Sequence, residues 1–202
     1  ILMAAYSYYS QDYYGDAIFE LKRFLKSYPE NDNYAYAYFL LASCYYETIV
    51  DEKKDLSSIL KSKEYFKIII NEYPNTDFAM DAKFKLLLID NLLASKELYI
   101  GKYYLDKKKW IPAINRFQNI VNDYDETEYV EEALHRLVEV HFLLGLEEES
   151  KKYASLLGYN YQSGGWYKES YRIFNKNYEN PVKKIKKDKQ NLIIKKFKKL
   201  FE

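Results

Sequence analysis

The chain of 202 residues has little cysteine, glycine or proline: one, six and four residues respectively. A single cysteine, Cys44, excludes an internal disulfide. Because the whole chain contains only two histidines besides, the sequence does not support a zinc site either. So few glycines and prolines leave little room for the many turns of a β-rich fold. No apolar run approaches the roughly 18 residues of a membrane-spanning helix. These absences predict an all-α protein, in which Cys44, within an apolar segment, is buried and unreactive.

Sequence signatures of catalysis are also missing. Gly164 and Gly165 form a lone doublet instead of a phosphate-binding loop, and no serine or cysteine lies in a recognised nucleophile motif. Glu132 and His135 have the Glu-x-x-His spacing of di-iron helix bundles, but His141, the other histidine, lacks the second glutamate that such a site needs. We therefore expect no enzymatic activity, no metal and no cofactor.

One helical-hairpin pattern recurs four times along the chain. A small residue is followed after four positions by an aromatic or apolar residue, after three more by an apolar residue, and after five more by a proline position. The copies are Ala17, Leu21, Phe24 and Pro29; Ser62, Phe66, Ile69 and Pro74; Ala113, Phe117, Ile120 and Asp125; and Ser150, Ala154, Leu157 and Gln162. This spacing is typical of the second helix of a tetratricopeptide repeat, whose period is about 34 residues. Because such units bury their apolar faces only by stacking, we expect a right-handed α-solenoid that serves as a binding scaffold.

The repeats divide the chain into a solenoid over 1–178 and a tail over 179–202. About four hairpins are expected, with helices near 1–11, 14–27, 33–48, 59–72, 78–104 and 110–122, a fourth unit over 127–157 and a capping helix over 163–178. Asn75, Thr76 and Asp77 predict a helix start, and Gly145 predicts a helix end. A charged insertion near 50–58 and an unusually long helix over 78–104 lengthen two of the repeat intervals beyond the ideal period.

Charge is distributed unevenly between these two parts. The tail holds nine lysines against three acidic residues, a net charge of +6, whereas residues 1–178 hold 22 basic and 27 acidic residues, a net charge of −5. Apolar residues interleave with the lysines from Gln190 onward, so the tail is either an amphipathic helix that docks on an anionic membrane or acidic partner, or a poorly ordered terminus. A net acidic array disfavours nucleic acid as a partner.

Tyrosine is the compositional outlier, with 24 residues. Many tyrosines fall on the first helices of repeat units, which line the concave face in solenoids of paired helices. One hypothesis is a groove with aromatic anchors for an extended peptide. The alternative is that the rings fill space between helices while their hydroxyls reach water. The candidate groove residues are Tyr6, Tyr9, Tyr34, Tyr38 and Tyr45.

Longer motifs carry a more specific resemblance. These are the segments 94–104 and 115–117, the residues Val121, Tyr124 and Thr127, and the segments 132–139, 144–146, 157–161 and 166–167. Together they resemble the BamD (ComL) family, the tetratricopeptide lipoproteins of the outer-membrane β-barrel assembly (BAM) machinery, in its alphaproteobacterial form. The likeness covers residues 1 to about 175. Gln162 departs from the family, which has proline near this position.

The resemblance implies a non-enzymatic protein on the periplasmic face of the outer membrane of a Gram-negative bacterium. The family's lipidated N-terminal cysteine, which would lie upstream of Ile1, would anchor it. Its implied partners are the POTRA domains of BamA, unfolded outer-membrane proteins and other lipoproteins of the BAM complex. The implied BamA-binding residues are Arg116, Asp123, Arg136 and Glu139. Arg116 matches the family's arginine that pairs with an acid of BamA. The alternative interpretation of Arg116 is an ordinary charged residue on a solvated helix face.

The sequence is also compatible with two other functions. Periplasmic tetratricopeptide proteins that coordinate envelope constriction with the Tol-Pal system share the Tyr-Pro repeat endings followed by an aromatic-alanine pair, as in Phe78-Ala79. A membrane-surface adaptor that uses the basic tail is a different class of protein. The long helix before the third repeat ending and the Trp166-Tyr167 pair favour the BamD family over the first alternative.

Overall fold

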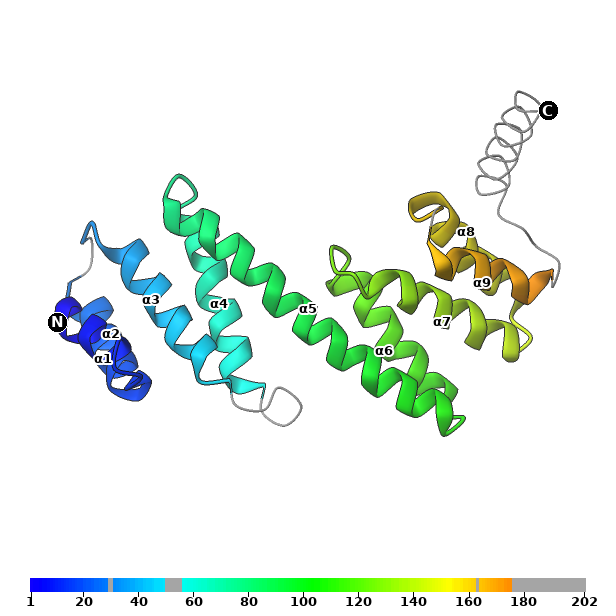
Figure 1. The fold of residues 1–202 in the computed structure, drawn as a ribbon, viewed down its shortest axis with the longest axis horizontal. Coiled ribbons are helices and arrows are strands. Elements are labelled where there is room, and N and C mark those ends of the chain that lie inside the picture. The colour runs from blue at the N-terminus through cyan, green and yellow to red at the C-terminus, as the bar shows by residue number, and fades with distance from the viewer. Residues whose placement is uncertain (29–30, 50–55, 163, 176–202) are drawn as a thin grey trace, which may run out of the picture. The chain divides into compact units, whose positions relative to one another are not determined.

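The computed structural model describes residues 1–28, 31–49, 56–162 and 164–175. Within these ranges the chain forms nine α-helices and no strand, which confirms the all-α prediction (Figure 1). The helices are α1 (Leu2–Tyr9), α2 (Tyr14–Ser27), α3 (Tyr34–Glu47), α4 (Ser57–Glu72), α5 (Asp77–Asp106), α6 (Trp110–Asp123), α7 (Val130–Leu143), α8 (Glu147–Asn160) and α9 (Gly165–Phe174). No helix of the described part combines the length and apolar character needed to cross a bilayer.

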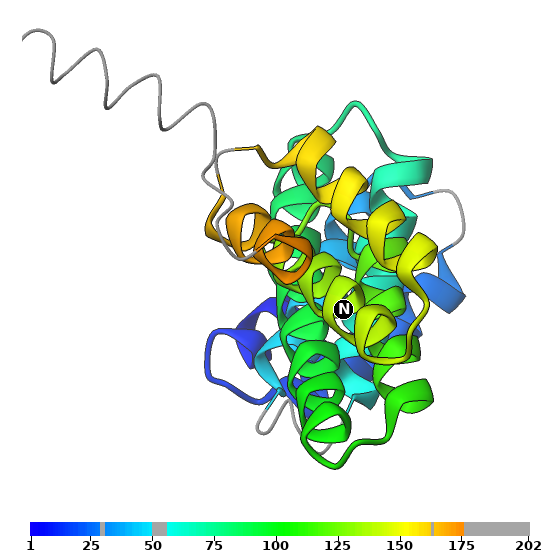
Figure 2. The ribbon, with the colours of Figure 1, turned by 90° about the vertical axis from the view of Figure 1, so that its right-hand side faces the viewer.

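The chain divides into two compact units, and the division between Lys96 and Glu97 falls inside α5. In the first unit α2 packs on both α1 and α3, and α3 packs on α4. In the second unit α6 packs on α7, which also contacts α8 and α9; Figure 2 shows α8 and α9 in yellow and orange beside α7. The handedness of a superhelix stays a prediction. The basic tail over 179–202 lies outside the described residues.

The recurring pattern forms the core contacts of the hairpins. Its first three positions are at most 5% exposed in every copy: Ala17, Leu21, Phe24, Ser62, Phe66, Ile69, Ala113, Phe117, Ile120, Ser150, Ala154 and Leu157. Where the small residue is serine, its buried hydroxyl donates to a carbonyl of the preceding helix, from Ser62 to Ala42 at 2.9 Å and from Ser150 to Val138 at 2.8 Å. The predicted register of the repeats is therefore confirmed.

Helix ends follow the local signals in the sequence. The Thr76 hydroxyl accepts a hydrogen bond from the Ala79 amide at 3.2 Å, which caps the start of α5. Gly145 follows α7 with a φ of 77°, a conformation that glycine adopts without a steric penalty. Of the predicted insertion near 50–58, residues 50–55 lie outside the described ranges, and α4 begins at Ser57. Cys44 is fully buried, and burial raises the pKa of its thiol to about 12.

Gly101 lies in the interior of α5, where it faces α6. A Cβ atom built on Gly101 would come within 2.5 Å of Cε1 of Phe117, whose side chain is fully buried. The long helix predicted over 78–104 is confirmed, because α5 continues through Gly101 and ends at Asp106. The reason is that a helical glycine is only mildly destabilising, about 1 kcal/mol relative to alanine, and here it lets the two helices approach closely.

Candidate partner-binding site

Arg116 on α6 is held by an acid of its own chain. Its Nη1 donates to both carboxylate oxygens of Glu97 on α5, at 2.9 and 3.2 Å, and the Asn119 side-chain amide donates to the same carboxylate at 3.0 Å. The side chain of Arg116 is 38% exposed and that of Glu97 is 15% exposed. The guanidinium is thus oriented by the fold while part of it faces solvent, so Arg116 is more than a freely solvated helix charge.

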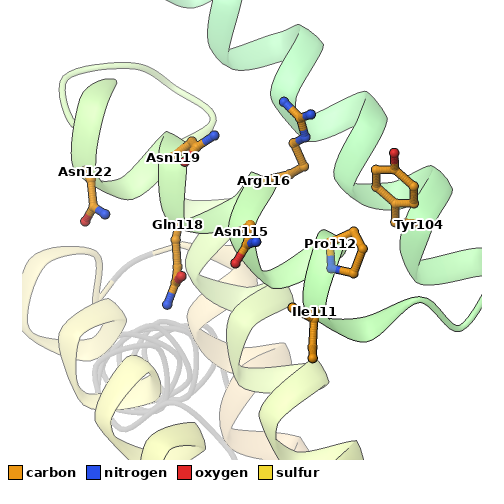
Figure 3. Close-up of a pocket in the computed structure, with 8 residues that line it drawn as sticks. All are labelled: Tyr104, Ile111, Pro112, Asn115, Arg116, Gln118, Asn119 and Asn122. Carbon is orange, nitrogen blue, oxygen red and sulfur yellow. The ribbon is translucent and has the colours of Figure 1, made fainter.

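An open pocket of about 520 Å³ surrounds this arginine (Figure 3). Its lining comes from the end of α5 and one side of α6: Tyr104, Ile111, Pro112, Asn115, Arg116, Gln118, Asn119 and Asn122. Figure 3 shows Arg116 directed toward α5, whereas Gln118 and Asn122 point away from it. Carboxamides and a guanidinium therefore provide most of the polar groups of this pocket.

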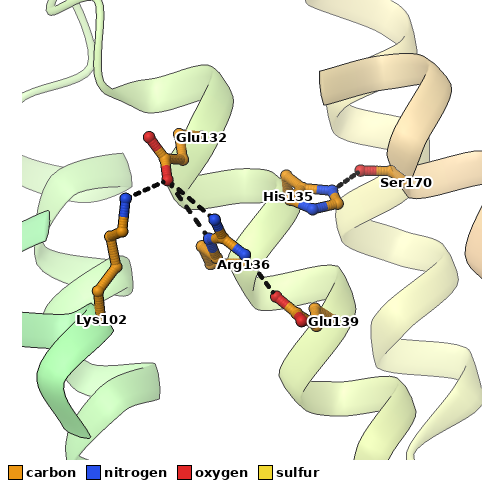
Figure 4. A network of polar contacts seen from close by, with 6 residues as sticks. All are labelled: Lys102, Glu132, His135, Arg136, Glu139 and Ser170. Carbon is orange, nitrogen blue, oxygen red and sulfur yellow. Dashed lines mark hydrogen bonds and ion pairs between the residues drawn. The ribbon is translucent and has the colours of Figure 1, made fainter. Parts of the chain in front are cut away.

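Arg136 on α7 is the centre of a second polar cluster (Figure 4). Its guanidinium donates to Glu132 at 3.1 Å and to Glu139 at 2.9 Å, and Lys102 from α5 donates to the same Glu132 oxygen at 3.0 Å. The guanidinium carbon also lies 5.4 Å from the ring centre of Trp166 on α9, within the range of a cation–π interaction. This cluster links α5, α7 and α9 and fixes the direction of the arginine.

His135 lies next to this cluster but faces the core. Its Nδ1 is 2.8 Å from the Ser170 hydroxyl of α9, and its ring centre is 4.9 Å from that of Trp166. Burial lowers the pKa of His135 from its ordinary value of 6.5; Arg136 lowers it further, whereas Glu139, Glu169 and Glu132 oppose the shift. The Glu-x-x-His spacing thus has a structural explanation. Glu132 forms ion pairs with Lys102 and Arg136, and His135 forms a hydrogen bond with Ser170 of α9.

The lowered pKa of His135 predicts a loss of stability in mild acid. As the pH falls below about 6.5, the unfolded chain takes up a proton at this histidine before the folded chain does, so the free energy of unfolding falls. We expect urea denaturation of the wild-type chain to give lower stability at pH 5.5 than at pH 7.5. His135→Asn is expected to reduce that difference, and an unchanged difference in this variant would assign the pH dependence to other groups.

The four residues predicted to bind BamA occupy three places in the second unit. Arg136 and Glu139 are in direct contact, and Arg116 belongs to the separate pair with Glu97. Asp123 is exposed and ends α6, two helical turns beyond Arg116. The structure brings no three of them into one hydrogen-bonded set among the described residues. Their role in binding stays a prediction.

Sequence reasoning did not assign the contacts that orient these two arginines. For Arg136 a signal existed, since Glu132 and Glu139 lie four positions before and three positions after it, on neighbouring turns of one helix. Glu97 gave no such signal, because it lies 19 positions from Arg116 and on another helix. Lys102, which pairs with Glu132 of α7, and Asn119, which donates to Glu97 of α5, were likewise identified only from the tertiary structure.

The five candidate groove tyrosines of the first unit fall into two sets. Tyr34, Tyr38 and Tyr45 lie on the side of α3 that meets α2 and α4, where Tyr38 and Tyr45 both stack on Tyr65. Tyr45 is only 7% exposed and belongs to the hydrophobic core.

The other set is on α1. Tyr6 is 51% exposed, and Tyr9 is half-buried with its ring 5.8 Å from that of Tyr14. In this structure Tyr6 is accessible to a ligand, whereas Tyr45 is not. The peptide groove itself stays a prediction, supported best at Tyr6.

Comparison with known proteins gives one consistent assignment. Residues 1–157 match the YfiO family, described as an outer membrane lipoprotein family. The outer membrane protein assembly factor BamD of Rickettsia prowazekii is 44% identical over 179 residues, which cover 89% of this chain and 71% of that protein. The protein of the same name from Caulobacter vibrioides is 38% identical over 177 residues, covering 88% of this chain and 58% of that protein.

The family match covers more than half of this chain, and the similarity to the Rickettsia protein covers more than two thirds of both chains. Both relatives are alphaproteobacterial, and the sequence motifs resemble the alphaproteobacterial form of the family. The tetratricopeptide-like hairpins described above fit this assignment. The chain belongs to the YfiO family of outer membrane lipoproteins.

Proposed function

We propose that this chain is a scaffold of the outer-membrane protein assembly machinery and that its second unit binds the POTRA region of BamA. Family membership and the printed name of both relatives, outer membrane protein assembly factor BamD, support the general role. The single observation that carries the binding site is the partly exposed guanidinium of Arg116, held in place by Glu97. A preoriented guanidinium suits bidentate recognition of a carboxylate on a partner.

Only one nitrogen of Arg116 is used in the internal pair. Both hydrogen bonds to Glu97 start from Nη1. Within the described residues Nε and Nη2 make no hydrogen bond, so they are able to donate to a second carboxylate. The Asn119 side-chain amide donates to the same Glu97 carboxylate and helps to hold that acid beside the arginine. The internal pair therefore lowers the entropy lost on binding, because the side chain is already ordered.

The proposal includes the location and substrates of the protein. We place it on the periplasmic face of the outer membrane, attached by a lipid anchor, in a complex with other BAM lipoproteins. Unfolded outer-membrane proteins would contact the tyrosine-bearing first unit, where Tyr6 is exposed. The role is binding and presentation, without chemistry on the substrate.

Direct binding tests this function. The full chain is immobilised, and the purified POTRA region of BamA from the same organism is passed over it at about 50 and 300 mM salt. We expect binding that weakens at the higher salt concentration, since a pair of exposed charges is screened. A folded, helical chain that binds no POTRA region would contradict the proposal and favour the envelope-constriction alternative. Co-sedimentation with anionic liposomes, with and without residues 179–202, tests the membrane-adaptor alternative.

A further inference from the structure

The turn between α7 and α8 exposes a contiguous group of large apolar side chains. Phe142, Leu143, Leu144 and Leu146 are 36, 60, 40 and 46% exposed, and only Gly145 interrupts them. Single exposed leucines are ordinary on a protein surface, whereas a contiguous apolar group indicates a contact surface. We name Phe142, Leu143, Leu144 and Leu146 the α7–α8 corner.

The backbone holds the α7–α8 corner in a defined shape. The Leu146 amide donates to the His141 carbonyl at 2.9 Å, and the Gly145 amide donates to the Phe142 carbonyl at 3.0 Å. Together with the positive φ of Gly145, these bonds form a glycine-terminated helix end. The exposed apolar side chains are therefore presented by an ordered turn.

The described part of the chain ends beside this corner. Phe174, the last residue of α9, packs edge-on against Phe142 with 5.6 Å between the ring centres, and Figure 1 shows the end of α9 next to the end of α7. Asn175 is the last described residue. The next fourteen residues, 176–189, can span up to about 45 Å at about 3.3 Å per residue. The segment beyond them, 190–202, is therefore able to reach the corner.

The sequence of residues 190–202, which lie outside the described residues, has the pattern of a basic amphipathic helix. We name these residues the basic segment. Its apolar residues follow the spacing i, i+1, i+4, i+7 and i+8, which places them on one face of a helix: Ile193, Ile194, Phe197, Leu200 and Phe201. On the same helix Lys196 and Lys198 would border that face. Such a helix has an apolar stripe to bury and cations at its edges.

Carboxylates border the α7–α8 corner. Glu147, Glu148 and Glu149 follow Leu146 directly and are exposed, so the first turn of α8 holds three carboxylates and no cation. Lys151 of the next turn pairs with Glu148 at 2.9 Å and lies 3.9 Å from Glu147. Glu149 forms no ion pair with any residue that the structure describes. An apolar surface with this edge favours a cationic segment and repels an anionic lipid surface.

We propose that the basic segment docks as a helix on the α7–α8 corner of its own chain. Its apolar stripe covers Phe142, Leu143, Leu144 and Leu146, and its lysines face the carboxylates at the start of α8. The acidic partner considered for the tail is thus the second unit itself. Because the segment is tethered, its effective concentration at the corner is on the order of millimolar, so a weak contact suffices. The inference does not involve Arg116 and is independent of POTRA binding.

Hydrogen exchange of the full chain, read by mass spectrometry, tests this proposal. In the wild type we expect the amides of residues 193–201 to exchange about tenfold more slowly than in the variant Leu143→Gln with Leu144→Gln. Glutamine is close to leucine in helix propensity, so α7 is expected to stay intact, which circular dichroism verifies. The matched control is Leu60→Gln with Leu88→Gln, two leucines outside the corner that are 52 and 39% exposed. It should leave the exchange of residues 193–201 as in the wild type.

A charge variant tests the acidic edge separately from the apolar contact. Glu148→Lys with Glu149→Lys leaves the corner leucines in place and is expected to speed exchange of the basic segment about threefold, a smaller effect because exposed charge pairs contribute little each. Fast exchange of residues 193–201 in the wild type would overturn the proposal. Equal protection in the wild type and the Leu143→Gln, Leu144→Gln variant would overturn it as well.

The same measurement separates docking within one chain from the other occupants of the corner and of the basic segment. Protection that is unchanged on dilution and present without lipid is the expected result. Protection that rises with protein concentration would overturn the proposal in favour of a second copy of the chain. Protection that appears only with vesicles of phosphatidylcholine and phosphatidylglycerol would overturn it in favour of a membrane surface.

Discussion

Phe117→Ala is expected to lower the free energy of unfolding by about 3–5 kcal/mol. The Phe117 side chain is fully buried at the second position of the repeat pattern, and its ring fills the space beside Gly101 between α5 and α6. Truncation to alanine removes this contact and leaves a cavity that rigid helices fill only in part. Urea denaturation followed by circular dichroism measures the effect. A midpoint that hardly moves would mean that this ring is not part of the core.

The close approach of Gly101 allows a sharper form of the same prediction. Gly101→Ala should destabilise the protein by about 1–3 kcal/mol, although alanine is the better helix former, because its Cβ atom would meet the ring of Phe117 at 2.5 Å. Gly15→Ala is the matched control: Gly15 lies in α2, a Cβ atom there meets nothing within 4 Å, and the change should stabilise the helix slightly. In the Phe117→Ala background the effect of Gly101→Ala should shrink or reverse.

Arg116→Glu is expected to weaken binding of the POTRA region about thirtyfold or more, while helical content stays unchanged. The reversed charge repels the partner's carboxylate and also faces Glu97, but Arg116 is partly exposed and the core beneath it is untouched. Arg116→Lys should retain part of the affinity, because lysine keeps the charge but not the bidentate geometry.

Arg172→Glu is the matched control for this prediction. Arg172 also pairs with a glutamate of its own chain, Glu169 at 3.0 Å, but it lies on α9 and outside the pocket. Its reversal should leave POTRA affinity within about twofold of the wild type. Equal losses for Arg116→Glu and Arg172→Glu would mean that general charge, and not the pocket, governs binding.

The hairpins could be predicted from the sequence because their signals are local. Burial at every third or fourth residue, the threonine cap at Thr76 and the glycine at Gly145 each act within one or two helical turns. The same periodicity could not show which helix faces which side chain. The close contact between Gly101 and the ring of Phe117 therefore has no counterpart in the sequence pattern.

The site was less predictable for the same reason. A resemblance suggested Arg116, but the Glu97 carboxylate that orients it comes from another helix and depends on tertiary packing. Tyr45 illustrates the opposite case: its place on a first helix suggested a groove, whereas packing against Tyr65 buries it. An aromatic residue on a helix with few polar positions has no sequence signal that separates the groove side from the core side.

A charge exchange tests the central claim most directly. The double variant Glu97→Arg with Arg116→Glu keeps an ion pair between α5 and α6 but moves the guanidinium to the other helix. We predict that it recovers the unfolding free energy of the wild type relative to Arg116→Glu, yet still fails to bind the POTRA region of BamA. Full recovery of binding by the exchanged pair would contradict the account, because Arg116 would then act only by holding α6 against α5.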